Sequence, residues 1–176
     1  MRIKHILILL PFVLLGCSNS PTPEDVMGEI TALESEIGSN PGSSQDQIKV
    51  LLAKYEEFAA FTEVDKEKKV DFLLRAGEMA ALVNQPKKSL TYYEKILTDY
   101  PDHSKAATAL FMKGYTLDDK LKKFDEARTV YEMFMKTYPD NDFADDTVFL
   151  LENLGKSEEE IIKLFEAKAA EAAAKE

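Results

Sequence analysis

A repeat of 38 residues constrains what this chain can fold into. The pair Tyr-Glu begins at Tyr55, Tyr93 and Tyr131, and the triplet Tyr-Pro-Asp begins at Tyr100 and Tyr138. Whole blocks of sequence are therefore in register, which is typical of an array of similar supersecondary units. Because one such unit cannot bury its apolar face alone, neighbouring units are expected to share a continuous core.

Apolar residues recur at spacings of three and four from Glu24 onward, and Gly, Pro, Asn or Asp interrupts the pattern between segments. This pattern predicts helices. The expected helices cover residues 24–37, 45–62, 66–83, 87–99, 104–118, 123–137, 142–153 and 158–174, which would make four hairpins. No segment alternates apolar and polar residues with a β-branched bias, so we expect an all-α fold without a sheet. Residues 24–176 are long enough for one domain with a continuous core.

The first residues of the chain have the order of a secretory signal. Arg2 and Lys4 precede an apolar stretch that is too short to span a bilayer as a helix. The stretch ends in Leu14-Leu15-Gly16-Cys17, which resembles the bacterial lipobox, whose cysteine accepts diacylglycerol. We therefore expect residues 1–16 to be a signal peptide, Cys17 to be the lipidated residue, and residues 17–23 to be a polar tether. The alternative interpretation is a buried first helix with an incidental cysteine. It would not explain why the basic residues, the apolar stretch and the small residue occur together.

Charge and cysteine content exclude several classes of protein. Removal of the signal peptide leaves 20 basic against 32 acidic residues, a net charge of −12. No basic stripe supports nucleic-acid binding. An acidic body also gains little from anionic lipid, so membrane attachment should rest on acyl chains such as palmitate. With Cys17 modified, no thiol remains for a disulfide or for a cysteine nucleophile.

Two blocks, residues 88–102 and 126–140, resemble the tetratricopeptide repeat. That family has a small residue early in its second helix, an aromatic residue four positions later, and a proline eight positions after the aromatic residue. The matching residues are Ser89, Tyr93 and Pro101 in one block, and Ala127, Tyr131 and Pro139 in the other. Gly77 and Gly114 match the glycine of the first helix, although Gly114 lies one residue early, which an extra residue near Asp119 to Lys122 explains. The resemblance covers residues 66–140 and implies a right-handed α-solenoid of about four hairpins.

The sequence offers little catalytic chemistry. His103 is the single histidine of the expected mature chain, so it cannot form a transition-metal site with a second histidine or a cysteine. Asp140, Asp142, Asp145 and Asp146 form an acidic cluster that lacks the glycine and the distal glutamate of an EF-hand. Helix capping accounts for this cluster, with weak calcium binding left open. Phosphate-binding loops and nucleophile elbows are absent from the sequence, so we predict no enzyme, no cofactor and no metal centre.

The resemblance implies that function resides in a concave groove lined by the first helix of each pair. The groove positions carried onto this chain are Asp71, Leu74, Glu78 and Ala81, followed by Thr108, Phe111, Tyr115 and Asp118. Phe111 and Tyr115 flanked by acidic residues would suit a basic or amphipathic segment of a partner protein. For Phe111, packing beneath the next unit is the alternative interpretation.

The combination of Tyr-Pro-Asp turns with a lipidated cysteine looks like the tetratricopeptide lipoprotein of the outer-membrane β-barrel assembly machinery. It is also similar to the periplasmic tetratricopeptide coordinator of cell division. Both resemblances imply an adaptor for protein partners in the bacterial envelope. Ser18 after Cys17, where an aspartate would resemble an inner-membrane retention signal, favours the outer membrane, facing the periplasm. The alternative is a lipoprotein that delivers a small ligand or peptide to a transporter, which would require an enclosed pocket.

Overall fold

The computed structural model describes residues 20–40 and 45–173, and all its regular elements there are helices. They are α1 (Pro23–Ser39), α2 (Gln45–Ala60), α3 (Lys66–Leu82), α4 (Pro86–Asp99), α5 (Ala106–Tyr115), the π-helical turn η1 (Thr116–Lys120), α6 (Phe124–Thr137), α7 (Ala144–Asn153) and α8 (Glu158–Ala173). Each predicted helix matches these bounds within two residues when η1 is counted with α5, and no strand occurs in this part of the chain. The predicted all-α class is confirmed. The predicted signal peptide, residues 1–16, and Cys17 lie outside the described residues.

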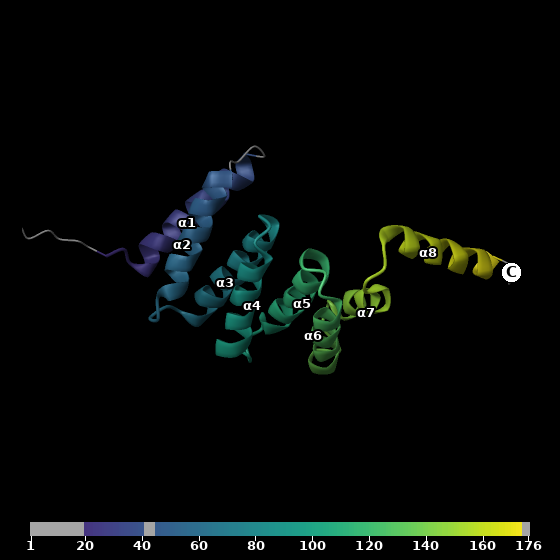
Figure 1. Ribbon diagram of the computed structural model, residues 1–176. Coiled ribbons are helices and arrows are strands. Elements are labelled where there is room, and N and C mark those ends of the chain that lie inside the picture. Colours follow the sequence, from purple (N-terminus) through teal and green to yellow (C-terminus); the bar gives the residue numbers. More distant parts are fainter. Residues whose placement is uncertain (1–19, 41–44, 174–176) are drawn as a thin grey trace, which may run out of the picture.

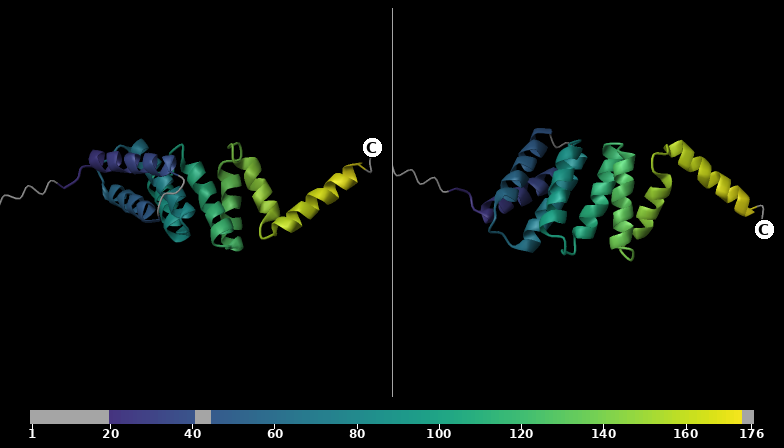
Figure 2. Two further views of the ribbon diagram at one scale, coloured as in Figure 1. Left: turned by 90° about the horizontal axis from the view of Figure 1, so that it is seen from above. Right: turned by 60° about the horizontal axis from the view of Figure 1, so that its bottom comes forward.

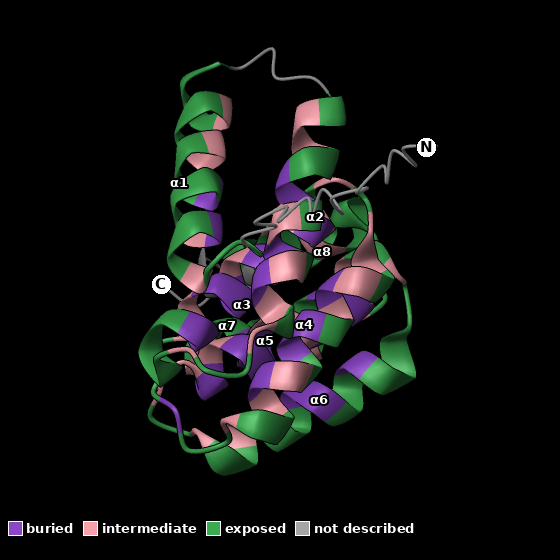
Figure 3. Ribbon diagram, turned by 90° about the vertical axis from the view of Figure 1, so that its left-hand side faces the viewer, coloured by how far each residue is buried: buried purple, intermediate pink, exposed green. Residues whose placement is uncertain are grey.

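The helices stack in chain order along one axis (Figures 1 and 2). Three antiparallel hairpins, α1 with α2, α3 with α4, and α5 with α6, pack one after another. Figure 3 shows that buried residues lie on the faces that the helices turn toward one another. The core therefore runs along the stack, as expected for a solenoid in which each unit contacts only its neighbours.

Two helical hairpins are held together by the same contact between a glycine and a tyrosine. A Cβ atom added at Gly77 would lie 2.4 Å from Cε1 of Tyr93, and one added at Gly114 would lie 2.6 Å from Cε1 of Tyr131. Both tyrosine rings are completely buried. Ser89 and Ala127, the small residues at the start of α4 and α6, are also completely buried. These residues let the two helices of each pair approach closely.

The π-helical turn η1 accommodates the extra residue of the third hairpin. Gly77 precedes Tyr93 by 16 positions, whereas Gly114 precedes Tyr131 by 17. η1 continues α5 with a wider turn, and a π turn takes up one more residue than an α turn. As a result, Tyr131 meets Gly114 in the same way that Tyr93 meets Gly77.

The turns after α4 and α6 repeat each other in detail. The backbone at Tyr100 (φ −138°, ψ 49°) and at Tyr138 (φ −132°, ψ 54°) is nearly the same. Three residues after each tyrosine, a side chain accepts a hydrogen bond from the backbone N–H two residues further on. His103 accepts from Lys105 and Asn141 accepts from Phe143, both at 3.1 Å. His103 is buried, and its Nε2 lies 2.8 Å from the Glu67 carboxylate at the start of α3. Its position and contacts make His103 a structural residue that joins two hairpins.

The fourth hairpin differs from the expected arrangement. α7 packs against α6, but α8 projects away from the stack (Figures 1 and 2). The Phe149 and Phe165 rings, 6.1 Å apart, provide a contact between α7 and α8. Glu152 stands 38 residues after Gly114, so the glycine that admits a tyrosine ring in the α3–α4 and α5–α6 pairs is missing here.

Among the described residues, no helix is both long enough and apolar enough to cross a lipid bilayer.

Candidate functional site

Ion pairs connect the first helices of successive hairpins in the N-terminal half of the stack. Arg75 on α3 contacts Glu34 on α1, with Nη1 2.6 Å from Oε2. Lys105, immediately before α5, pairs with Asp71 on α3. Asp71 therefore has a cationic partner within the molecule, which reduces its availability to an incoming ligand.

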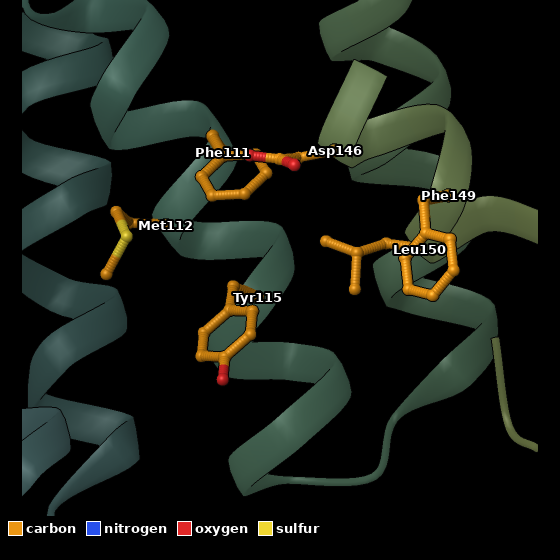
Figure 4. A pocket seen from close by; sticks show the side chains of 6 residues that line it. All are labelled: Phe111, Met112, Tyr115, Asp146, Phe149 and Leu150. Carbon is orange, nitrogen blue, oxygen red and sulfur yellow. The ribbon is translucent and has the colours of Figure 1, made fainter. Parts of the chain in front are cut away.

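An apolar pocket of about 310 Å³ lies between α5 and α7. Figure 4 shows that Phe111, Met112 and Tyr115 line it from α5, while Asp146, Phe149 and Leu150 line it from α7. Because α5 and α7 are the first helices of their pairs, this pocket lies on the side of the stack where the sequence predicted a groove. It is open to solvent, unlike the enclosed cavity that buries most of a small ligand. We refer to these six residues as the α5–α7 pocket.

Phe111 and Tyr115 contribute to the α5–α7 pocket in different ways. Phe111 is only 8% exposed, and its ring stacks on Phe143 with 4.5 Å between centroids and 9° between planes. It also contacts the rings of Tyr131 and Phe134. Most of the Phe111 side chain packs beneath the next unit, as the alternative interpretation held, and Phe111 also lines the α5–α7 pocket, so its assignment to the groove stays a prediction. Tyr115 is 39% exposed and is available to a ligand.

The other predicted groove positions do not join this pocket. Leu74 is buried in the core around α3 and α4, and Ala81 and Thr108 are partly buried. Glu78 is exposed on α3, and Asp118 in η1 is partly buried. Burial raises the pKa of the Asp118 carboxyl. The Glu78 side chain is exposed, but neighbouring atoms partly desolvate its carboxyl, which raises its pKa against the opposing effects of Lys105 and Arg75. A nearby cation would favour the ionised form of each group.

The residues on the α7 side of the pocket were missed by sequence reasoning. Phe149, 42% exposed, and Leu150 lie 38 residues after Phe111 and Met112. The period could therefore have identified them, had the groove positions been carried into the weaker fourth unit. Asp146 is the only pocket residue with an acidic side chain, and no ion pair to it occurs in the described part of the chain.

The acidic residues after Pro139 act at the start of α7. Asp145 and Asp146 occupy its first turn, where carboxylates interact favourably with the helix dipole. The Asn141 side chain accepts the backbone N–H of Phe143. In residues 20–40 and 45–173, no group of three His, Cys, Asp or Glu side chains has an arrangement that could hold a metal ion. Pro101 and Pro139 are exposed just beyond their helices, as turn residues.

The tetratricopeptide repeat family matches residues 71–103 and 108–141 of this chain. The two matches cover α3 with α4 and α5 with α6, the pairs that contain the glycine–tyrosine contacts. The fold is an all-α solenoid, and the chain contains tetratricopeptide repeats. Repeats of this kind generally mediate protein–protein interactions and are typically not enzymes. No curated protein matches the sequence.

Proposed function

We propose that this protein is a lipid-anchored adaptor of the bacterial envelope that binds a segment of a partner protein in the α5–α7 pocket. The observation that carries the proposal is an open apolar pocket between the first helices of two neighbouring units. Tyr115 and Phe149, from opposite sides of it, are both partly exposed. Helix grooves of this form bind apolar anchor residues of peptides.

The chemistry of the pocket supports a partner segment with both apolar and basic residues. Its volume, about 310 Å³, suits one or two large apolar side chains. Each such side chain contributes about 1.5 to 3 kcal/mol when buried. Asp146 lies at the pocket, and Asp118 follows Tyr115 by three residues. A lysine or arginine beside the apolar anchors would pair with these carboxylates.

The binding proposal is tested by crosslinking intact cells that express the full-length chain, followed by affinity purification and mass spectrometry. The double variant Tyr115→Ala, Phe149→Ala should recover at least ten-fold less partner protein than the wild type, because it removes the exposed apolar walls of the pocket. Both residues are exposed enough for the fold to persist, which circular dichroism checks. Met133→Ala, an exposed apolar residue on α6, is the matched control.

Two outcomes of the crosslinking experiment would count against the adaptor function. Equal recovery of partner proteins by the double variant and the wild type would place binding elsewhere on the molecule. Recovery of a small molecule without any protein partner would instead support the alternative of a ligand-delivering lipoprotein.

The envelope location is a separate part of the proposal, and it rests on Arg2, Lys4, the apolar stretch and the Leu-Leu-Gly-Cys sequence that ends at Cys17. Cys17→Ser should prevent lipidation, so the chain should keep residues 1–16 and take up no labelled palmitate. Metabolic labelling combined with separation of the inner and outer membranes measures both effects. Labelling of the Cys17→Ser variant equal to that of the wild type would exclude Cys17 as the lipidated residue. Wild-type protein in the inner membrane would contradict the outer-membrane assignment.

A further inference from the structure

A second hollow, about 470 Å³ in volume, lies between α2 and α4 and shares no residue with the α5–α7 pocket. Ala59, Ala60 and Tyr92 supply apolar lining, and Lys87, Lys88 and Lys95 surround it with amines. α2 and α4 are the second helices of their hairpins, so this hollow belongs to a different side of the stack. We refer to it as the lysine groove.

The charge of the lysine groove is opposite to that of the molecule as a whole, whose net charge is −10. Lys88 pairs with Glu56 at 2.6 Å, and Lys95 pairs with Asp99 at 2.7 Å. Lys87 is exposed and has no ion-pair partner in the described part of the chain. Glu56 also lines the hollow, so its lining carries three lysines against one carboxylate, an excess of positive charge that favours an acidic segment with apolar side chains.

Tyr92 adds a polar group to this hollow. Its side chain is buried, and its hydroxyl makes no hydrogen bond within residues 20–40 and 45–173. Burial raises the pKa of Tyr92 to about 12, so the hydroxyl remains a donor at neutral pH. A buried donor without a partner is unfavourable, and a carboxylate or carbonyl of a bound segment would satisfy it after a small side-chain movement.

α8 has the complementary chemistry and lacks a packing partner along most of its length. Ile162 is 55% exposed and Phe165 is 56% exposed. Glu158 and Glu159 precede Ile162 by one helical turn, and Glu166 follows it by one turn, so these carboxylates lie on the same face as the apolar residues. This face of α8 is apolar at its centre and acidic at both ends.

We propose that α8 of one molecule docks in the lysine groove of a second copy of this chain. The groove lies toward the N-terminal end of the stack and α8 extends from the opposite end, so the contact cannot form within one molecule (Figures 1 and 2). Different surfaces of the two copies meet in this contact. An interface of this kind is heterologous and, unless a ring closes, joins molecules head to tail into a chain.

The test uses full-length protein in cells, with Thr91→Cys in the lysine groove and Ile162→Cys on α8 of the same chain. The sequence has no cysteine besides Cys17, so oxidation should produce a ladder of covalent oligomers on a non-reducing gel. With Cys17 lipidated as proposed, each single cysteine variant has one thiol and can form at most a dimer, so the supporting result is a ladder that only the double-cysteine chain gives. A single band from the double-cysteine chain, under conditions that oxidise exposed thiols, would overturn the proposal.

Charge reversal makes the test specific. Lys87→Glu with Lys95→Glu should abolish the ladder, and the further changes Glu158→Lys and Glu159→Lys should restore it. Arg128→Glu with Lys136→Glu, two exposed residues of α6, should leave the ladder unchanged. A ladder that persists after reversal of the groove lysines would show that another contact forms it.

The lysines could instead serve a membrane surface. In that case the double-cysteine chain would give no ladder but would bind phosphatidylglycerol vesicles, and Lys87→Glu with Lys95→Glu would abolish that binding. None of these variants touches the α5–α7 pocket, so capture of the partner protein is an independent result.

Discussion

Replacing Gly77 with alanine is expected to lower the free energy of unfolding by about 3 kcal/mol, the upper end of the range for overpacked cores. The new methyl group would lie 2.4 to 2.9 Å from three carbons of the Tyr93 ring. This ring is completely buried between α3 and α4, so it cannot move aside without separating the two helices. Urea unfolding followed by circular dichroism, extrapolated linearly to water, measures the change.

Gly28→Ala is the matched control for Gly77→Ala. Gly28 lies inside α1, and no heavy atom lies within 4 Å of the position of its added Cβ. Alanine should therefore raise stability there by up to about 1 kcal/mol, because it restricts the unfolded chain and favours helix. Gly114→Ala should destabilise in the same way as Gly77→Ala, through the Tyr131 ring. Equal stability of Gly77→Ala and the wild type would mean that the ring relaxes freely, and the explanation of the repeat glycine would be wrong.

Lys69→Met is the second change with a large expected effect, a loss of about 2 to 4 kcal/mol. The Lys69 side chain is buried, and its amine donates hydrogen bonds to the backbone carbonyls of Phe58, Ala59 and Phe61 at 3.0, 2.8 and 2.6 Å. These carbonyls lie at the end of α2, where the helix leaves acceptors unsatisfied and its dipole favours a cation. Methionine keeps the length of the apolar stem but removes all three bonds.

The control for Lys69→Met is Lys68→Met, at the neighbouring exposed position of α3. An exposed lysine makes few contacts, so this change should alter stability by less than about 0.5 kcal/mol. Thermal unfolding of both variants alongside the wild type provides the comparison. Similar melting temperatures for Lys69→Met and Lys68→Met would indicate that water replaces the amine at the end of α2 without cost.

Local pattern was sufficient to predict the helices and their pairing inside the repeats. Helix bounds depend on spacing and on punctuation such as Pro101 and Pro139, which act within a few residues of their own position. The course of α8 could not be predicted in this way. Its apolar pattern is that of a helix in a hairpin, and its departure from α7 depends on contacts between the two helices that the spacing within α8 does not reveal.

The site was predictable only in part because it combines residues from two units. Tyr115 was identified from the groove positions of one repeat, and it does line the α5–α7 pocket. The depth at which Phe111 lies depends on Phe143, which belongs to the turn before the next helix. Asp71 was likewise assigned to a groove, but Lys105 neutralises it from the neighbouring unit. A contact between two units depends on the residue that each unit supplies, so the pattern within one unit does not predict it.

The wide turn η1 makes the number of residues in a hairpin independent of the way its two helices meet. One more residue lies between glycine and tyrosine in the third hairpin than in the second, yet the turns at Tyr100 and Tyr138 have nearly the same backbone angles. The contact between glycine and tyrosine is therefore kept although the number of residues between them differs. The extra residue before α6 is absorbed within η1, and the turn after α6 repeats the turn after α4.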